Sequence, residues 1–240
     1  MKQVVVTKDL VKKFGELRAV DRLNLQIQKG EIYGFIGPNG SGKTTTIKIL
    51  SGLLRPTSGE SYVLGCRIPD PSIFPRIGYM PQEVALYPDL TVSQTISFFG
   101  EIYGLGKKEM EKREEELLAF VDMKAKRKEM VSNLSGGMRH RLSLAVSLIH
   151  KPELLFLDEP TVGVDPELRT SFWEYFRDLT EDGVTVLLTT HYMDEASRCD
   201  RVGMIREGKL VAVGTPDQLK EKTNTQSLED AFLHYVRRIG

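Results

Sequence analysis

The segment Gly37-Pro-Asn-Gly-Ser-Gly-Lys-Thr44 decides the fold of this 240-residue chain. It fits the phosphate-binding pattern GxxxxGK[ST], in which glycines leave backbone N–H groups free to converge on phosphate oxygens. The residues before it, Glu31 to Ile36, are apolar enough for a buried strand. Thr45 to Leu50 predicts the start of a helix, whose N-terminal dipole favours anions. Lys43 is expected to reach the β- and γ-phosphates and the Thr44 hydroxyl to ligate Mg²⁺, so the chain is predicted to bind a nucleoside triphosphate.

Composition narrows the class of protein. Lys+Arg and Asp+Glu are both 33, so the net charge is zero, and no nucleic-acid partner held by bulk electrostatics is expected. No apolar run approaches the ~18 residues that cross a bilayer, and no signal peptide is evident. We expect a cytoplasmic protein whose work on a membrane needs a partner chain. Cys66 and Cys199 match no metal-ligand spacing and are expected to be reduced thiols.

Short apolar runs separated by helical patterns predict an α/β fold with a mostly parallel sheet and helices on its faces. The predicted strands are Val4–Val6, Ile32–Ile36, Ile77–Met80, Leu154–Leu157, Val184–Thr189 and Val202–Ile205. Predicted turn and capping signals are Asp165-Pro166, Gly183, Thr91 with Gln94, Thr215 with Gln218, and a hairpin turn at Glu207-Gly208.

The stretch from about residue 83 to residue 150 differs from the rest, because it is helix-rich, charged over Lys107–Lys128 and lacks a clear strand. We predict a helical lobe over 83–150, inserted into a catalytic core made of 1–82 and 151–220. The remainder, 221–240, is expected to be a helical tail, with an amphipathic helix over Ser227–Ile239.

A second group of polar residues follows the apolar run Leu154–Leu157. Ligands of open α/β sheets bind at the carboxyl ends of the strands, where this run ends in Asp158-Glu159. Asp158 is expected to hold Mg²⁺ and Glu159 to polarise an attacking water as a general base. The alternative is a solvated turn, but a phosphate-binding loop in the same chain favours a functional pair.

Asn133-Leu-Ser-Gly-Gly-Met138 precedes apolar residues at helical spacing. The turn Ser135-Gly136-Gly137 therefore lies at a helix N-terminus, a second place where an anion can bind. Taken alone, the turn is better explained as an ordinary N-cap with flexible glycines; a second anion site becomes useful if both sites serve the same phosphate from different sides.

Together these residues resemble the nucleotide-binding subunit of an ATP-binding cassette (ABC) transporter, over nearly the whole chain and in the family's order. The matching segments are Gly37–Thr44 (Walker A), Gln82 (Q-loop), Leu134–Met138 (the signature LSGGQ), Leu154–Glu159 (Walker B), Val162–Asp165 (D-loop) and His191 (switch histidine). Phe14 falls where the family stacks an aromatic ring on adenine, and Val20 is expected among the nucleotide-binding residues.

The resemblance implies a P-loop NTPase (RecA-like) core, an N-terminal antiparallel β portion and the inserted helical lobe. It implies two such domains, identical or different, that sandwich two ATP molecules head to tail and drive a transmembrane permease subunit. The residues expected to hold ATP or Mg²⁺ in the P-loop are Gly37, Pro38, Asn39, Gly40, Ser41, Gly42, Lys43, Thr44 and Thr45. Gln82 would sense the metal and the water, His191 would steady the γ-phosphate, and Asp165 would connect the two sites. Ser135, Gly136 and Gly137 would cover ATP bound on the partner.

Met138 departs from the family pattern, which has glutamine most often there. Methionine is common in members that resemble drug, antibiotic and lipid exporters, so export is expected. The alternatives are a soluble ABC ATPase, such as an iron–sulfur assembly type, and a non-hydrolysing regulatory cassette. His140, His150 and His234 match no functional position and are expected to be structural or on the surface. Tyr87–Thr91 is a candidate contact for the permease.

Overall fold

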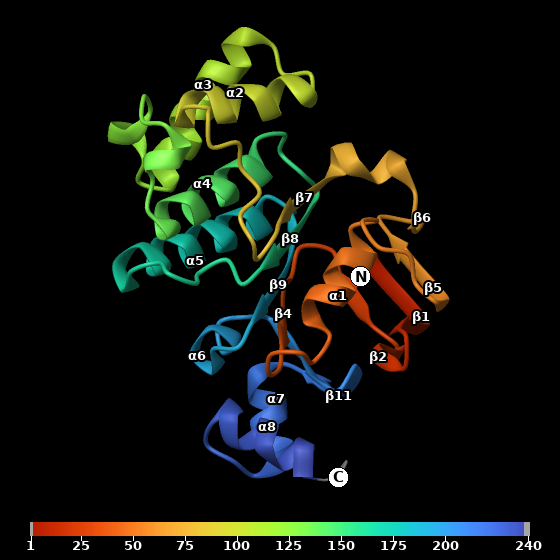
Figure 1. The fold of residues 1–240 in the computed structure, drawn as a ribbon. Coiled ribbons are helices and arrows are strands. Elements are labelled where there is room, and N and C mark those ends of the chain that lie inside the picture. The colour runs from red at the N-terminus through yellow and green to blue at the C-terminus, as the bar shows by residue number, and fades with distance from the viewer. Residues whose placement is uncertain (1, 238–240) are drawn as a thin grey trace.

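A six-stranded sheet forms the centre of the molecule (Figure 1). The structure is a computed structural model that describes residues 2–237. Five strands run parallel, and β11 pairs antiparallel with β10. In sheet order the strands are β11 (Lys209–Gly214), β10 (Arg201–Arg206), β4 (Ile32–Ile36), β9 (Thr185–Thr190), β8 (Leu154–Asp158) and β7 (Ile77–Met80). The predicted parallel sheet is confirmed, with strand ends within one residue of those expected.

Both faces of the central sheet are covered, which explains why its strands read as continuous apolar runs. Side chains alternate along β8: Leu155 and Leu157 face one core, and Leu154 and Phe156 face the other. The first core includes α5 (Pro166–Glu181), and the second includes α1 (Lys43–Leu50). The sheet is thus the middle layer of the molecule (Figure 1).

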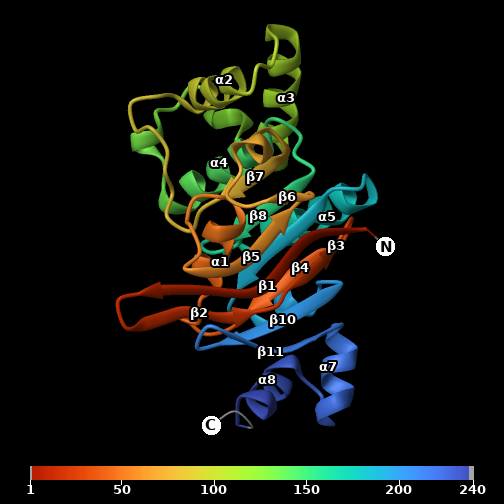
Figure 2. The ribbon, with the colours of Figure 1, turned by 90° about the vertical axis from the view of Figure 1, so that its right-hand side faces the viewer.

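A second, antiparallel sheet packs over α1 on one side of the molecule (Figure 2). It contains β1 (Gln3–Phe14), β2 (Leu17–Leu23), β3 (Gln26–Gln28), β5 (Ser58–Val63) and β6 (Cys66–Arg67). The N-terminal antiparallel portion implied by the resemblance is confirmed. Residue patterns located only Val4–Val6 of this sheet. Its strands are half-exposed, and register shifts interrupt the pairing of β1 with β2, β3 and β5, so no regular alternation marks them in the sequence.

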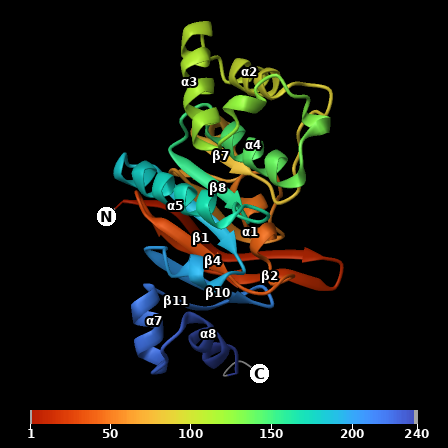
Figure 3. The same cartoon turned by 90° about the vertical axis from the view of Figure 1, so that its left-hand side faces the viewer.

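The expected helical stretch contains α2 (Val92–Ile102), α3 (Lys107–Phe120) and α4 (Gly136–Leu148), which lie beyond the β7 edge of the sheet (Figure 3). Short 3₁₀ turns lie before and between the helices, at η1 (Pro71–Arg76), η2 (Lys124–Lys126) and η3 (Val131–Asn133). As expected, this part of the described chain has no strand, and its one β-bridge joins Thr91 to Met130.

After β9 the chain forms α6 (Met193–Ala196), and after β11 it forms α7 (Pro216–Thr223) and α8 (Leu228–Arg237) below the sheet (Figure 1). The predicted tail helix therefore begins at Leu228, and residues 238–239 of that prediction lie outside the described residues. Both predicted capping boxes are present, and Gly183 has a φ of +86° after α5. Within residues 2–237, no helix combines the length and apolarity that a membrane span requires.

Candidate nucleotide-binding site

Four expected site residues follow four neighbouring parallel strands. Gly37 follows β4, Gln82 follows β7, Glu159 follows β8 and His191 follows β9. Since the carboxyl ends of parallel strands meet at one edge, the fold brings these residues together from positions up to 154 apart in sequence (191 − 37).

Lys43 is the first residue of α1, and only 5% of its surface is exposed. Its Nζ donates to the carbonyl oxygens of Gly37 and Pro38, at 2.8 and 3.2 Å. Burial lowers the pKa of Lys43, and the nearby carboxylates of Glu159 and Asp158 oppose that shift. No side chain caps α1, so its first N–H groups point into the loop as donors for an anion.

The loop requires glycine at position 42. Gly42 has a φ of +104°, and a Cβ there would lie 2.2 Å from the carbonyl oxygen of Ala19 in β2. The tip of the β10–β11 hairpin supports the same loop, because Gly208 N–H donates to the Ser41 carbonyl at 2.9 Å. Two elements distant in sequence therefore fix the shape of the phosphate-binding loop.

Asp158, the last residue of β8, is fully buried. Its Oδ1 accepts a 2.5 Å hydrogen bond from the Thr189 hydroxyl, whereas its buried Oδ2 has no partner. Burial raises the pKa of this carboxyl, although the hydroxyls of Thr189 and Thr44 lower it. A buried, unpartnered carboxylate oxygen beside a hydroxyl provides the hard oxygen donors that Mg²⁺ prefers.

Glu159 follows with its carboxylate between two polar side chains. The Gln82 amide donates to one carboxylate oxygen at 3.3 Å, and His191 Nδ1 lies 3.3 Å from the other. The backbone N–H of Glu159 is held by the Thr189 hydroxyl at 3.0 Å. Glu159 is therefore an oriented carboxylate, suited to accept a proton from water.

A cavity of about 370 Å³ joins these parts. Lys43, Thr44, Gln82 and Glu159 line its polar side. Its other lining residues are Phe14, Leu17, Ala19, Asn39, Gly40, Ser41, Gly42 and Thr45.

The apolar end of this cavity contains Phe14, with 49% of its surface exposed, as the adenine-stacking expectation requires. Val20 does not reach the cavity, because its side chain points into the core of β1 and β2 and is fully buried. Leu17 and Ala19 line the cavity instead. In the alternating pattern of a strand, residues 17 and 19 share a face that residue 20 cannot share.

The signature turn, Ser135-Gly136-Gly137, does not line this cavity. Ser135 is exposed and caps α4, with its Oγ accepting from Met138 N–H at 3.2 Å. The N-cap interpretation is thus correct for Ser135, and the turn still presents its surface to solvent. A phosphate that reached it would come from outside this chain.

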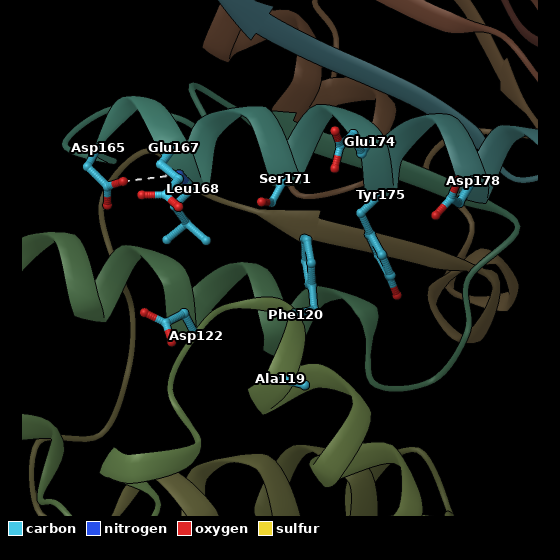
Figure 4. Close-up of a pocket in the computed structure, with 10 residues that line it drawn as sticks. All are labelled: Ala119, Phe120, Asp122, Asp165, Glu167, Leu168, Ser171, Glu174, Tyr175 and Asp178. Carbon is cyan, nitrogen blue, oxygen red and sulfur yellow. Dashed lines mark hydrogen bonds between the residues drawn. The ribbon is translucent and has the colours of Figure 1, made fainter.

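Asp165 lies at a larger cavity of about 610 Å³ between the C-terminal end of α3 and α5 (Figure 4). There its Oδ1 caps α5 by accepting from Leu168 N–H at 3.0 Å. Five carboxylates line this cavity, from Asp122, Asp165, Glu167, Glu174 and Asp178. Their charge would repel a triphosphate, which favours the smaller cavity as the candidate nucleotide site.

Residue patterns missed several groups that hold the site. Glu195, 1% exposed, accepts hydrogen bonds from the Thr161 and Thr190 hydroxyls and so ties the segment after β8 to the segment before His191. His140 is buried and its Nε2 lies 2.9 Å from the carbonyl oxygen of Glu159. These contacts join residues 5 to 34 apart, and no local spacing marks them.

The other two histidines lie away from the cavity. His150 stacks on Tyr103, with ring centroids 3.7 Å apart, and its Nε2 lies 2.8 Å from the Ile77 carbonyl. His234 lies on α8.

Comparisons with known proteins show the family of the chain. A family model described as "ABC transporter" matches residues 20–162. The probable multidrug ABC transporter ATP-binding protein YbhF of Escherichia coli is 45% identical over 97% of this chain, which spans 42% of that protein's length. The linearmycin resistance ATP-binding protein LnrL of Bacillus subtilis is 38% identical over 97% of this chain and 78% of its own length.

Solved structures show the same architecture. The structure of an ATP-binding subunit of an ABC transporter aligns with a TM-score of 0.90 at 27% identity, over 97% of this chain and 99% of that one. A dimeric post-hydrolysis state of the ATP-binding cassette MJ0796, bound to ADP and Pi, aligns with a TM-score of 0.82 at 27% identity, over 88% of this chain and 98% of that one. The chain belongs to the ABC transporter family and is one of its ATP-binding cassettes.

Proposed function

We propose that this chain binds and hydrolyses ATP as half of a head-to-tail dimer, and that ATP-driven closure of the dimer powers export through a separate membrane permease. One observation carries the proposal. The carboxylate of Glu159 is held between Gln82 and His191, at 3.3 Å from each, on the wall of the cavity that the phosphate-binding loop forms.

The cavity accounts for the placement of the nucleotide. The adenine ring would stack on Phe14, and the triphosphate would follow the loop to the first turn of α1, where Lys43 stands. Lys43 would exchange its bonds to the Gly37 and Pro38 carbonyls for bonds to phosphate oxygens. The ammonium group would thus exchange neutral carbonyl acceptors for anionic phosphate oxygens, and this pairing of opposite charges favours binding.

A magnesium ion fits the remaining donors. Thr44, Gln82 and Asp158 would hold it, with nucleotide phosphates completing its oxygen ligands. Bound there, Mg²⁺ supplies neutralisation of the charge that develops on the phosphate oxygens.

Hydrolysis depends on the position of the attacking water. Glu159 would accept its proton, while Gln82 and His191 hold the carboxylate in place. Since His191 Nδ1 contacts a carboxylate, Nδ1 acts as the donor, and Nε2 would donate to the γ-phosphate when the imidazole also carries its second proton. Positioning and charge stabilisation supply most of the rate in such transfers.

A second cassette, identical to this chain or different, completes each site. The exposed turn at Ser135, Gly136 and Gly137 would cover the γ-phosphate bound by the partner, and Asp165 would lie between the two sites. The dimeric MJ0796 structures, which share this fold, support such an arrangement.

An apolar groove on the surface supports the proposal of a permease partner. It has a volume of about 580 Å³ and lies between η1 and α2, with the exposed side chains of Leu53, Phe74, Ile102 and Tyr103 on its rim. Tyr87, 54% exposed, packs edge-on against Phe98 of α2 at 5.2 Å and extends this apolar surface. Exposed apolar surface of this kind marks a protein contact, and we assign it to a cytoplasmic helix of the permease. The chain would then sit on the cytoplasmic face of the membrane.

Export is favoured by the relatives, which include a linearmycin resistance, a daunorubicin resistance and a Nod factor export ATP-binding protein. These names favour a transport subunit over the soluble alternative.

The test is ATP hydrolysis by the purified chain and by Glu159→Gln. We expect the variant to retain ATP binding and to hydrolyse ATP at least ~100-fold more slowly. A positioned general base accelerates proton transfer by about this factor or more. Glu153→Gln is the control, since Glu153 is exposed and pairs with Arg76 at the far end of β8. Turnover by Glu159→Gln within a few-fold of wild type would contradict the proposal.

A further inference from the structure

His140 contacts the backbone of the catalytic glutamate. It lies on the second turn of α4, 7% exposed, with Nε2 2.9 Å from the carbonyl oxygen of Glu159. A carbonyl oxygen only accepts hydrogen bonds, so Nε2 carries the proton and donates. The helix that begins at the signature turn is therefore hydrogen-bonded to the residue that would activate water in the same chain.

The backbone at Glu159 needs such a restraint. Its φ is +56°, in the left-handed region, and the following residue is Pro160. A non-glycine residue holds this conformation only where surrounding contacts over-determine it. The Glu159 carbonyl receives two donors, His140 Nε2 and, at 3.3 Å, Val162 N–H. Loss of the His140 donor would leave only the longer bond on the Glu159 carbonyl and so weaken the restraint on the backbone that carries the carboxylate.

A second contact fixes α4 against the same segment. A Cβ on Gly137 would lie 2.7 Å from the Gly163 carbonyl oxygen, so the backbones of the signature turn and of the D-loop touch. Residues 137 and 140 are three apart and share one face of the helix. That face thus meets the chain on both sides of the turn after Glu159, at residues 159 and 163.

We propose that His140 is a positioning residue, which holds the Glu159 carboxylate in its reactive orientation through the Glu159 carbonyl. The proposal rests on the ATPase function proposed above. If so, α4 connects the two ATP sites of the dimer. The helix that would cover the partner's ATP would also position the glutamate that acts on the ATP of its own chain.

Three variants test the role in catalysis. His140→Leu removes the donor, and we expect kcat to fall about tenfold, the rate equivalent of one hydrogen bond, with KM for ATP unchanged. His140→Gln keeps an N–H at the same reach and should recover kcat to within about twofold. The matched control is Arg113→Met, because Arg113 is also buried and donates to a backbone carbonyl, that of Leu148, at the other end of α4. Arg113→Met should lower the melting temperature and leave kcat unchanged.

Wild-type kcat in His140→Leu, or a failure of His140→Gln to recover kcat, would overturn the proposal. Titration of each variant with Mg-ADP shows whether it retains a folded nucleotide site, so that loss of fold and loss of catalysis are told apart.

A double variant separates positioning of Glu159 from a direct role in covering the partner's ATP. Glu159→Gln alone should form an ATP-bound dimer on size-exclusion chromatography, and His140→Leu combined with Glu159→Gln should form it to the same extent. Loss of the dimer only in the double variant would place His140 in the clamp and refute its action through Glu159. Failure of Glu159→Gln itself to dimerise would count against the proposed function, while the kcat comparison would still decide the role of His140.

Discussion

At the scale of single residues, Asp158 stands in surroundings that oppose its charge. It is fully buried, and one of its carboxylate oxygens has no partner. Burial raises its pKa, which means that the folded chain holds a proton at this site more tightly than the unfolded chain does. A buried charged carboxylate of this kind lowers the free energy of unfolding of the nucleotide-free protein. A bound cation would neutralise the charge and remove this cost.

The cost of burying the Asp158 charge can be measured from how the free energy of unfolding changes with pH. Between the ordinary pKa of 3.8 and the raised value, the folded state carries more protons than the unfolded state. The free energy of unfolding of the wild type therefore decreases across that window as pH rises, and Asp158→Asn lacks this component. Denaturant titrations without nucleotide should show the stability of Asp158→Asn, relative to wild type, increasing with pH and then levelling off. A constant difference would contradict the account, and added Mg-ATP should stabilise the wild type more than the variant.

At this scale the sequence predicted residues that belong to local patterns, such as Lys43 in its loop and Glu159 at the end of an apolar run. Leu17 and Ala19 were missed because residues 17–20 show no pattern that tells the face toward the cavity from the face toward the core. His140 was taken as structural; its contact with Glu159 arises only when α4 packs beside β8, 19 residues away.

At the scale of secondary-structure elements, the groove between η1 and α2 leaves apolar surface in water. Ile102 at the end of α2 has 62% of its surface exposed, and Phe74 of η1 has 40%. Removing such side chains from water favours association with a partner protein. This surface supports the proposal that the cassette docks on another protein.

Ile102→Glu tests the docking surface, because it places a charge where the permease helix would bury apolar surface. We expect loss of a membrane protein that co-purifies with the tagged wild-type chain in detergent, with ATP hydrolysis by the free chain unchanged. Leu233→Glu, which alters an exposed leucine of α8 away from the groove, should keep the partner. Mass spectrometry identifies the partner, and its equal recovery with both variants would contradict the assignment.

The elements themselves were predictable where burial is complete on both faces. The central strands β4, β8 and β9 are buried along their whole length, and their predicted ends lie within one residue of the observed ends. The second sheet was not found from residue patterns, since β5 reads Ser-Gly-Glu-Ser-Tyr-Val and buries only alternate residues near its end. Its pairing with β1 depends on contacts about 50 residues apart, which local periodicity does not record.

At the scale of the whole molecule, the two places that would bind a γ-phosphate do not meet within one chain. The cavity beside Lys43 is lined without any residue of the signature turn, and Ser135 faces solvent at the start of α4. A clamp on ATP, as proposed above, would therefore require a second cassette. ATP would hold such a dimer together and hydrolysis would release it, so that closure would depend on the nucleotide.

The signature turn is proposed to act on the partner's ATP, and the molar mass of Glu159→Gln with and without Ser135→Arg, from light scattering in Mg-ATP, tests this role. We expect a dimer for Glu159→Gln and a monomer for the double variant, because arginine at residue 135 blocks the turn. The ATP affinity of the monomer should stay unchanged. A double variant that dimerises as fully as Glu159→Gln, or one that loses ATP affinity as a monomer, would contradict it.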